Sequence, residues 1–367
     1  MDRLLIVRLG SLGDIVHALP AAAALCEAWP QARLDWLVDR RNLEILQLVP
    51  IIDRRIVLER PTLAGWLQVV RELRQTRYDV AIDLQGLLKS AALARASGAR
   101  RIVGFAATHL RERTARPFYT EAIDPGAGAH VIHKNLARVA ALGAPATTLR
   151  FPLRRSESQA LAAVRAELAR DPGGTGPALP RDPGGTGLQP CARYALINPG
   201  AAWPNKRWPP DRFGAVAACL RERFALPSVV LWGPGEEPLA QAVAASSRGA
   251  ARVAPATTIS DLVELGCAAA LMVSGDTGPL HIAAAVGAPV VSLFGPSDPH
   301  RNGPWSPDDE VVSRYGECGC HYQRTCRRQA WCLDDITVAE VTAAIQRRLA
   351  RTGTRNEERG MRNEIKS

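Results

Sequence analysis

The chain has 367 residues, of which 47% are hydrophobic, and a formal net charge of +10. This length predicts two domains, each large enough to bury its own core. No apolar run reaches the roughly 18 residues that a membrane-spanning helix needs. The chain opens on a strand pattern rather than on the regions of a secretory signal, so we expect a cytoplasmic protein.

The basic residues are almost all arginine, and only Lys89, Lys134, Lys206 and Lys366 are lysines. Codon composition explains such a bias, but an arginine-rich surface also favours anionic partners such as phosphates and acidic lipids. The basic residues are not interleaved with aromatic residues, and the sequence contains no nucleic-acid-binding module. We therefore expect no nucleic-acid partner, and a peripheral contact with an anionic membrane surface is a weaker expectation.

The first half of the chain alternates predicted strands and helices. Strands are expected at 4–9, 33–39, 54–59, 78–84 and 100–105, with helices at 15–29, 62–76 and 86–97. Strands separated by helices of this length predict a parallel sheet built from βαβ units. Residues 106–130 are less regular and are expected to form surface loops.

A segment rich in proline and glycine divides the chain. A predicted helix at 156–170 leads into the block RDPGGTG, which occurs at 170–176 and again at 181–187. Such a composition does not pack a core. We interpret 169–192 as a linker between an N-terminal domain, 1–168, and a C-terminal domain, 193–350.

The second half repeats the alternation of strands and helices. Strands are expected at 194–200, 228–233, 268–273 and 290–295, helices at 211–224, 238–246, 260–267, 279–286 and 337–350, and a charged, disordered tail at 351–367. Ligands of such sheets bind at the carboxyl ends of the strands. The loops of interest are therefore GSLGD (10–14), QGLLKS (85–90), NPGAAWPNKRW (198–208), GPGEE (233–237) and SGDTGPLH (274–281).

Each of these loops has a functional and a structural interpretation. The turn of SGDTGPLH lies at a helix N-terminus and suits a phosphate, although Asp276 could instead cap that helix. Asp14 could be a general base or a helix cap. Lys206 suits a phosphate oxygen or lies in a solvated loop, and Glu236 or Glu237 could bind a ribose or cap a helix.

Four segments together resemble glycosyltransferase family 9, the lipopolysaccharide heptosyltransferases: VRLGSLGDIVHALPAAAAL, AIDLQGLLKSA, NPGAAWPNKRWPPDRF and SGDTGPLHIAAAVGAPVVSLFGPSDP. The resemblance extends over residues 3–345 apart from the duplicated linker, and it is closer to heptosyltransferase I than to heptosyltransferase II. It implies an α/β protein with the GT-B fold, in which two Rossmann-like domains face each other across a cleft. The N-terminal domain would bind a Kdo-lipid A acceptor, and the C-terminal domain would bind ADP-heptose.

The resemblance also implies roles for individual residues. Asp14 matches the family's catalytic base, Lys206 its diphosphate-binding lysine, Asp276, Thr277, Gly278 and His281 its donor motif, and Glu237 its nucleoside-binding glutamate, with Glu236 as the alternative register. The implied reaction inverts the anomeric carbon: Asp14 deprotonates the acceptor hydroxyl, and Lys206 stabilises the departing phosphate. No D-x-D pair follows a strand, so the reaction is expected to require no metal cofactor.

Four cysteines near the C-terminus, Cys318, Cys320, Cys326 and Cys332, are not part of the family pattern quoted above. Four thiolates can hold a tetrahedral structural zinc. The C-x-C spacing is less typical of zinc than C-x₂-C, so reduced or redox-active thiols are the alternative.

Three other functions remain open. They are a family 9 transferase with another donor sugar, a nucleotide-sugar epimerase of the same fold, and a non-catalytic nucleotide-sugar-binding protein. Asp14, Lys206 and His281 together argue against the last. The expected partners are ADP-heptose and Kdo-lipid A, with peripheral contact at the cytoplasmic face of the inner membrane.

Overall fold

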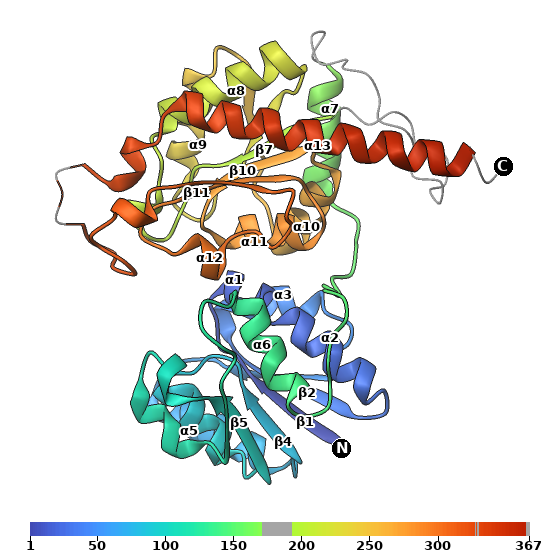
Figure 1. Ribbon diagram of the computed structural model, residues 1–367, viewed down its shortest axis with the longest axis vertical. Coiled ribbons are helices and arrows are strands. Elements are labelled where there is room, and N and C mark those ends of the chain that lie inside the picture. The colour runs from blue at the N-terminus through green and yellow to red at the C-terminus, as the bar shows by residue number, and fades with distance from the viewer. Residues whose placement is uncertain (171–192, 327, 329, 365–367) are drawn as a thin grey trace. The chain divides into compact units, whose positions relative to one another are not determined.

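The computed structural model describes residues 1–170, 193–326, 328 and 330–364. The chain forms two compact units, Met1–Arg155 and Ser156–Ser367. Each unit is built on a six-stranded sheet (Figure 1). Apart from its first two residues, the predicted linker 169–192 lies outside the described residues, as does nearly all of both RDPGGTG copies.

The first unit is a doubly wound parallel sheet. Its strands are β1 (Arg3–Val7), β2 (Arg33–Asp39), β3 (Arg54–Leu58), β4 (Val80–Asp83), β5 (Arg101–Phe105) and β6 (Glu121–Ile123). Its helices are α1 (Leu12–Val16), α2 (Leu19–Ala28), α3 (Leu43–Gln47), α4 (Leu63–Arg74), α5 (Leu88–Ala96) and α6 (Val131–Ala140). The strand order β3-β2-β1-β4-β5-β6 places β1 beside β4, where the direction of winding reverses. Ligand-binding loops of this fold lie at that reversal.

Apolar residues of the strands pack against apolar residues of the helices in this unit. Leu5 and Val7 of β1 share a buried core with Val69 and Leu73 of α4. Helix α4 begins where the Thr62 side chain accepts a hydrogen bond from the Gly65 N–H, which supplies one of the acceptors that a helix N-terminus lacks.

The second unit repeats the same winding. Its strands are β7 (Ala195–Asn198), β8 (Ser228–Val230), β9 (Ala251–Val253), β10 (Leu271–Gly275), β11 (Val290–Phe294) and β12 (Glu310–Ser313). Its helices are α7 (Gln159–Ala169), α8 (Pro210–Phe224), α9 (Glu237–Ser246), α10 (Ile259–Ala268), α11 (Gly278–Ala285), α12 (Pro299–Asn302) and α13 (Val338–Glu364). The order β12-β11-β10-β7-β8-β9 places the reversal between β10 and β7.

Successive strand residues of the second unit face two different cores. Ala195 and Ile197 of β7 pack in the core that includes α8, α9 and α13. Leu196, between them, packs in the core that includes α7, α10 and α11. Helices therefore cover both faces of this sheet, which is why its strands are apolar at nearly every position.

The structure corrects two predicted boundaries. Residues 156–168 were assigned to the N-terminal domain, but Leu161, Val164 and Leu168 of α7 pack in a core of the second unit. The tail 351–367 was expected to be disordered, but α13 continues to Glu364. Its extension is rich in Arg and Glu, which have high helix propensity, and contains no proline.

No helix in the described part of the chain is both long enough and apolar enough to cross a bilayer. The longest, α13, has 27 residues and is strongly charged.

Candidate active site

The second unit gathers its polar residues at the reversal of the sheet. Asn198 ends β7 and the loop after it supplies Lys206, while the loop after the neighbouring strand β10 supplies Asp276 and Thr277. Parallel pairing brings the carboxyl ends of β7 and β10 to one edge of the sheet. The loops that the sequence singled out therefore do lie together within this unit.

Asp276 is the centre of this group. Its Oδ2 accepts hydrogen bonds from Lys206 Nζ at 2.5 Å and from Ser297 Oγ at 2.6 Å. Its Oδ1 lies 3.1 Å from His281 Nε2, which is the donor because a carboxylate only accepts. The carboxylate is thus held by three side chains from three separate segments.

The charges around Asp276 keep it ionised. Burial alone would raise the pKa of this carboxyl, but the hydrogen bond from His281 and the charge of Lys206 hold the pKa well below its usual range. The side chains of Asp276 and His281 are only 7% and 6% exposed, whereas that of Lys206 is 16% exposed. Lys206 is therefore the most accessible of these three side chains.

Close packing fixes the Lys206 loop in place. The Lys206 ammonium lies 4.8 Å from the centre of the Trp203 ring, within the range of a cation–π contact. A side chain at Gly275 would approach the Lys206 carbonyl oxygen to 2.8 Å. Glycine is needed at that position because the backbone of the lysine loop passes directly over it.

Thr277, not Asp276, is the N-cap residue of α11. Its hydroxyl is 3.0 Å from Asn198 Nδ2 and 3.1 Å from Ser274 Oγ, so the side chain anchors the turn. The first N–H groups of a helix have no intrahelical acceptors. Gly278 begins the helix and has no side chain to cover them, which leaves a positive helix end beside Lys206.

The GPGEE turn places Glu236, rather than Glu237, against the other loops. Glu236 Oε2 accepts from the Gly233 N–H at 3.2 Å, and Oε1 lies 3.5 Å from Arg207 Nη2. A Cβ at Gly200 would lie 2.0 Å from Glu236 Oε2, so this carboxylate rests on the loop after β7. Glu237, the residue favoured from the sequence, is exposed and pairs with Gln241.

Asp14 lies in the first unit, in the loop that follows β1. Its Oδ2 accepts from the Ser11 N–H at 3.1 Å and from Ser11 Oγ at 2.8 Å. It also stands in the first turn of α1, so it has the capping contacts that the structural interpretation required. Its side chain is nevertheless 28% exposed, which leaves the carboxylate within reach of a ligand.

Arg8, which the sequence did not single out, is the charged partner of Asp14. Arg8 Nη2 lies 2.6 Å from Asp14 Oδ1, and Nη1 donates to the carbonyl of Leu84 after β4. The Arg8 side chain is 7% exposed. The two oxygens of Asp14 thus have different partners, and the carboxylate is fixed in one orientation.

The four C-terminal cysteines form a buried cluster of their own. Cys318 Sγ lies 3.2 Å from Cys320 Sγ. Burial, together with the neighbouring thiols, raises the pKa of Cys320 and of Cys332 to about 12. Among the described residues, no three or more His, Cys, Asp or Glu side chains are already arranged to hold a metal ion.

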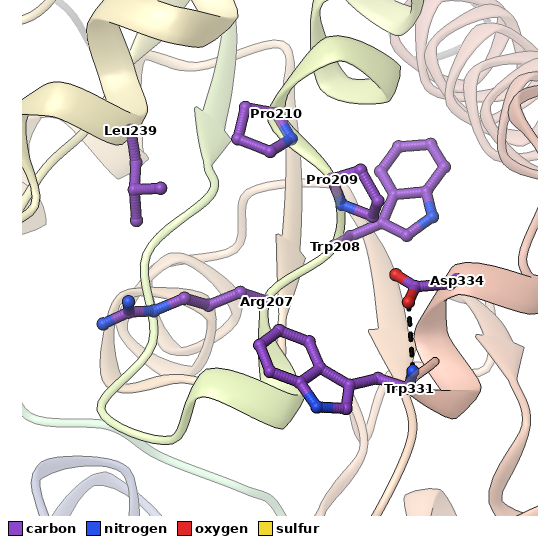
Figure 2. A pocket seen from close by; sticks show the side chains of 7 residues that line it. All are labelled: Arg207, Trp208, Pro209, Pro210, Leu239, Trp331 and Asp334. Carbon is purple, nitrogen blue, oxygen red and sulfur yellow. Dashed lines mark hydrogen bonds between the residues drawn. The ribbon is translucent and has the colours of Figure 1, made fainter. Parts of the chain in front are cut away.

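A separate pocket of about 400 Å³ lies next to the loop that carries Lys206 (Figure 2). It is lined by Arg207, Trp208, Pro209, Pro210, Leu239, Trp331 and Asp334. Its polar groups are already paired, because Arg207 Nε donates to the Ala201 carbonyl and Asp334 accepts from the Trp331 N–H. None of Lys206, Asp276 and His281 lines it, so we do not assign it to the site around Asp276.

The fold and the site together define a class of protein. Two parallel sheets of Rossmann order, one with a cation and a helix N-terminus at its reversal, are typical of nucleotide-dependent glycosyltransferases of the GT-B fold. Residues 66–332 match the family described as glycosyltransferase family 9 (heptosyltransferase). The chain belongs to this family and is a glycosyltransferase of the heptosyltransferase type.

Individual relatives agree with this assignment. The chain is 30% identical to lipopolysaccharide heptosyltransferase 1 of Pseudomonas aeruginosa over 89% of this chain and 88% of the relative. It is 28% identical to lipopolysaccharide heptosyltransferase 3 of Escherichia coli, over 93% and 98%. Similarity therefore extends to more than one type of heptosyltransferase.

Solved structures share the fold. The E. coli heptosyltransferase WaaC with ADP-2-deoxy-2-fluoro heptose has a TM-score of 0.69 at 24% identity, over 94% of this chain and 99% of that one. The E. coli ADP-heptose lps heptosyltransferase II has a TM-score of 0.71 at 20% identity, over 96% and 100%. The predicted GT-B architecture of two Rossmann-like domains is confirmed.

Proposed function

We propose that the chain transfers heptose from ADP-heptose to a Kdo sugar of the lipopolysaccharide inner core, as a type I heptosyltransferase. The observation that carries the proposal is the group around Asp276, where Lys206 stands beside the N-terminus of α11. The family and the names of the relatives support the choice of sugar and of acceptor. A family 9 transferase with another donor is the second candidate. Type 3 relatives are nearly as similar as type 1, so the choice of type I within the heptosyltransferases is part of the proposal.

The second unit is the proposed donor-binding unit. The diphosphate would lie against the first N–H groups of α11, with Lys206 donating to it from the neighbouring loop. Asp276 would not contact the phosphate, because both of its oxygens are taken and two anions repel each other. Its role is to hold Lys206 and His281 in place.

The nucleoside end of the donor is assigned to Glu236. A carboxylate accepts the hydrogen bonds that ribose hydroxyls donate. Glu236 rests against Gly200 and Gly233, close to the loop that carries Lys206, whereas Glu237 is turned toward Gln241. We therefore transfer the nucleoside-binding role from Glu237, where the family resemblance had placed it, to Glu236.

The first unit supplies the proposed base. Asp14 accepts the proton of the acceptor hydroxyl while that oxygen forms its bond to the anomeric carbon of the heptose. The bond from this carbon to the β-phosphate oxygen breaks on the opposite side, so the configuration inverts and ADP leaves with the electron pair. Lys206 and the N–H groups of Thr277 and Gly278 offset the charge that builds on the leaving phosphate, and the proposed step needs no metal ion.

The site of action is proposed to be the cytoplasmic face of the inner membrane. The net charge of +10 favours approach to an anionic lipid surface. Sedimentation with vesicles of phosphatidylglycerol should be strong at low salt and weak above about 0.3 M salt, because screening shortens the reach of surface charges. Absence of binding, or binding that salt does not change, would contradict this part of the proposal.

Donor selectivity tests the proposal at the site that carries it. ADP-heptose should raise the melting temperature of the full chain more than UDP-glucose or GDP-mannose does at equal concentration. The Lys206→Met variant should lose most of that shift, while Arg223→Met, a change of an exposed cation on α8, should keep it. An equal or larger shift with a UDP- or GDP-sugar would favour the second candidate.

A further inference from the structure

The C-terminal cysteines form a sequence motif that the proposed transfer does not use. Cys318, Cys320 and Cys332 are 4%, 3% and 1% exposed, and the half-buried Cys326 packs against them. Cys320 forms side-chain hydrogen bonds with Cys318 and Cys326, and Cys332 forms one with Cys318. Four sulfur atoms from a short stretch of chain therefore converge on one buried point.

The segment that carries these thiols is tied to the lysine loop of the donor site. Asn205 precedes Lys206 and is only 1% exposed. Its Nδ2 donates to the Gln323 carbonyl at 2.8 Å and lies 4.0 Å from Cys320 Sγ. The position of Lys206 thus depends on the segment 318–323.

The same cluster also touches the loop that supplies Ser297. A side chain at Gly295 would approach Cys332 Sγ to 2.9 Å, and the Tyr322 N–H donates to the Pro296 carbonyl at 2.8 Å. Ser297 in turn donates to Asp276. The cysteine segment therefore contacts two loops that each donate a hydrogen bond to Asp276. One follows β7 and carries Lys206, and the other follows β11 and carries Ser297.

The chemistry of four converging thiols favours a soft metal ion. Thiolates bind Zn²⁺ or Fe²⁺ in a tetrahedral arrangement, with Zn–S distances of about 2.3 Å. In the structure the thiols hydrogen-bond to one another. The distance between the Cys318 and Cys320 sulfurs is 3.2 Å, which is shorter than the roughly 3.8 Å between two sulfur ligands of a tetrahedral zinc. His321 is engaged elsewhere, since its ring stacks on Tyr315.

We propose that Cys318, Cys320, Cys326 and Cys332 bind one thiophilic metal ion, zinc in the first place, and that the filled site holds the Lys206 and Ser297 loops around Asp276. Binding replaces the S–H protons, which pass to solvent, and involves no oxidation or reduction. The sulfurs move apart by a few tenths of an ångström as the metal enters. The proposal of a metal site depends on the cysteines alone, whereas the proposed effect of the metal on donor binding also rests on the proposed function.

Metal content tests the site itself. The full chain should be purified without a metal-binding tag and kept reduced. Elemental mass spectrometry should then find about one zinc or iron ion per chain. Cys320→Ser and Cys332→Ser should lower that content, whereas Cys219→Ser, a half-buried thiol of α8 outside the cluster, should leave it unchanged. Less than about 0.2 metal per wild-type chain would overturn the proposal, whether or not the variants fold.

Titration with ADP tests the link to the donor site. Protein stripped of metal by a chelator should bind ADP about tenfold more weakly, and added Zn²⁺ should restore the affinity. Unchanged ADP affinity after proven metal loss would refute the link while leaving the metal site intact. If metal-loaded protein did not bind ADP at all, the proposed donor function would fail, and the metal content would still decide the site.

Discussion

The ammonium of Lys206 and the carboxylate of Asp276 lie 2.5 Å apart in the second unit, with both side chains largely buried. Asp276 is also held by His281 and Ser297, so the carboxylate that binds the lysine is itself fixed in place. An ammonium has three donors. This pair therefore presents a fixed cation whose remaining donors can meet a phosphate.

Loss of the Lys206 charge should slow the chemical step. We expect Lys206→Met to lower kcat by about a hundredfold or more, the usual scale for removing a group that stabilises a developing charge. Lys206→Arg should retain part of the activity, because charge is kept while the point-like geometry is lost. Steady-state transfer assays measure this, and wild-type kcat in Lys206→Met would exclude the assigned role.

The carboxyl of Asp276 should make the stability of the protein sensitive to acid. Its folded-state pKa is below the unfolded value of about 3.9, so its contribution is complete above that pH and declines as the pH falls below it. Asp276→Asn should cost about 3 kcal/mol at pH 7, since it breaks a buried ion pair. Melting curves from pH 3 to pH 7 should show this cost shrinking in acid.

A matched surface variant separates this effect from general loss of charge. Glu222→Gln removes an exposed carboxylate that pairs with Arg248 and should change stability by less than about 1 kcal/mol at every pH. If Asp276→Asn behaved in the same way, the carboxyl would not be the buried anchor described above.

The two adjacent glutamates provide their own control. Glu236→Gln should raise the KM for ADP-heptose by about tenfold, because a charged hydrogen-bond acceptor is lost, with little change in kcat. Glu237→Gln should leave both constants near wild type, since this carboxylate is exposed and turned toward Gln241. The reverse pattern would return the nucleoside-binding role to Glu237.

Arg8 should act through Asp14 and not through the donor. Arg8→Gln leaves the Asp14 carboxylate without its buried partner, so we expect kcat to fall by about tenfold or more while ADP affinity stays unchanged. Arg8→Lys should recover part of the rate. Arg101→Gln, which breaks a half-exposed pair with Glu121 in the same unit, should have no effect. Equal loss in the Arg101 variant would mean that Arg8 is only structural.

The sequence predicted the central strands of both sheets and the edge strand β3, but it missed the other three edge strands. β6, β9 and β12 are edge strands of three or four residues. They are covered less completely than the central strands, so they lack the continuous apolar run that identifies a buried strand. Predicted strands such as 33–39 and 100–105 lie within one residue of the observed bounds because they have that pattern.

The candidate site was predicted as a set of loops but not as a network. Ser297 follows β11 and reaches Asp276 only because of the register between β10 and β11, which no local pattern specifies. The choice between Glu236 and Glu237 depends on the turn before them, where Gly235 has a φ of 78°. Arg8 stood within the first motif, but a strand-end arginine gave no local signal of its contact with Asp14.

Formation of a heptosylated product tests the central claim most directly. With ADP-heptose and a Kdo-lipid A acceptor, the full chain should yield ADP and an acceptor heavier by one heptose residue, detected by mass spectrometry. Asp14→Asn should form that product at least about a hundredfold more slowly while ADP affinity stays nearly unchanged. No heptosylated acceptor from a wild-type chain that binds ADP-heptose, or near-normal turnover by Asp14→Asn, would contradict the account.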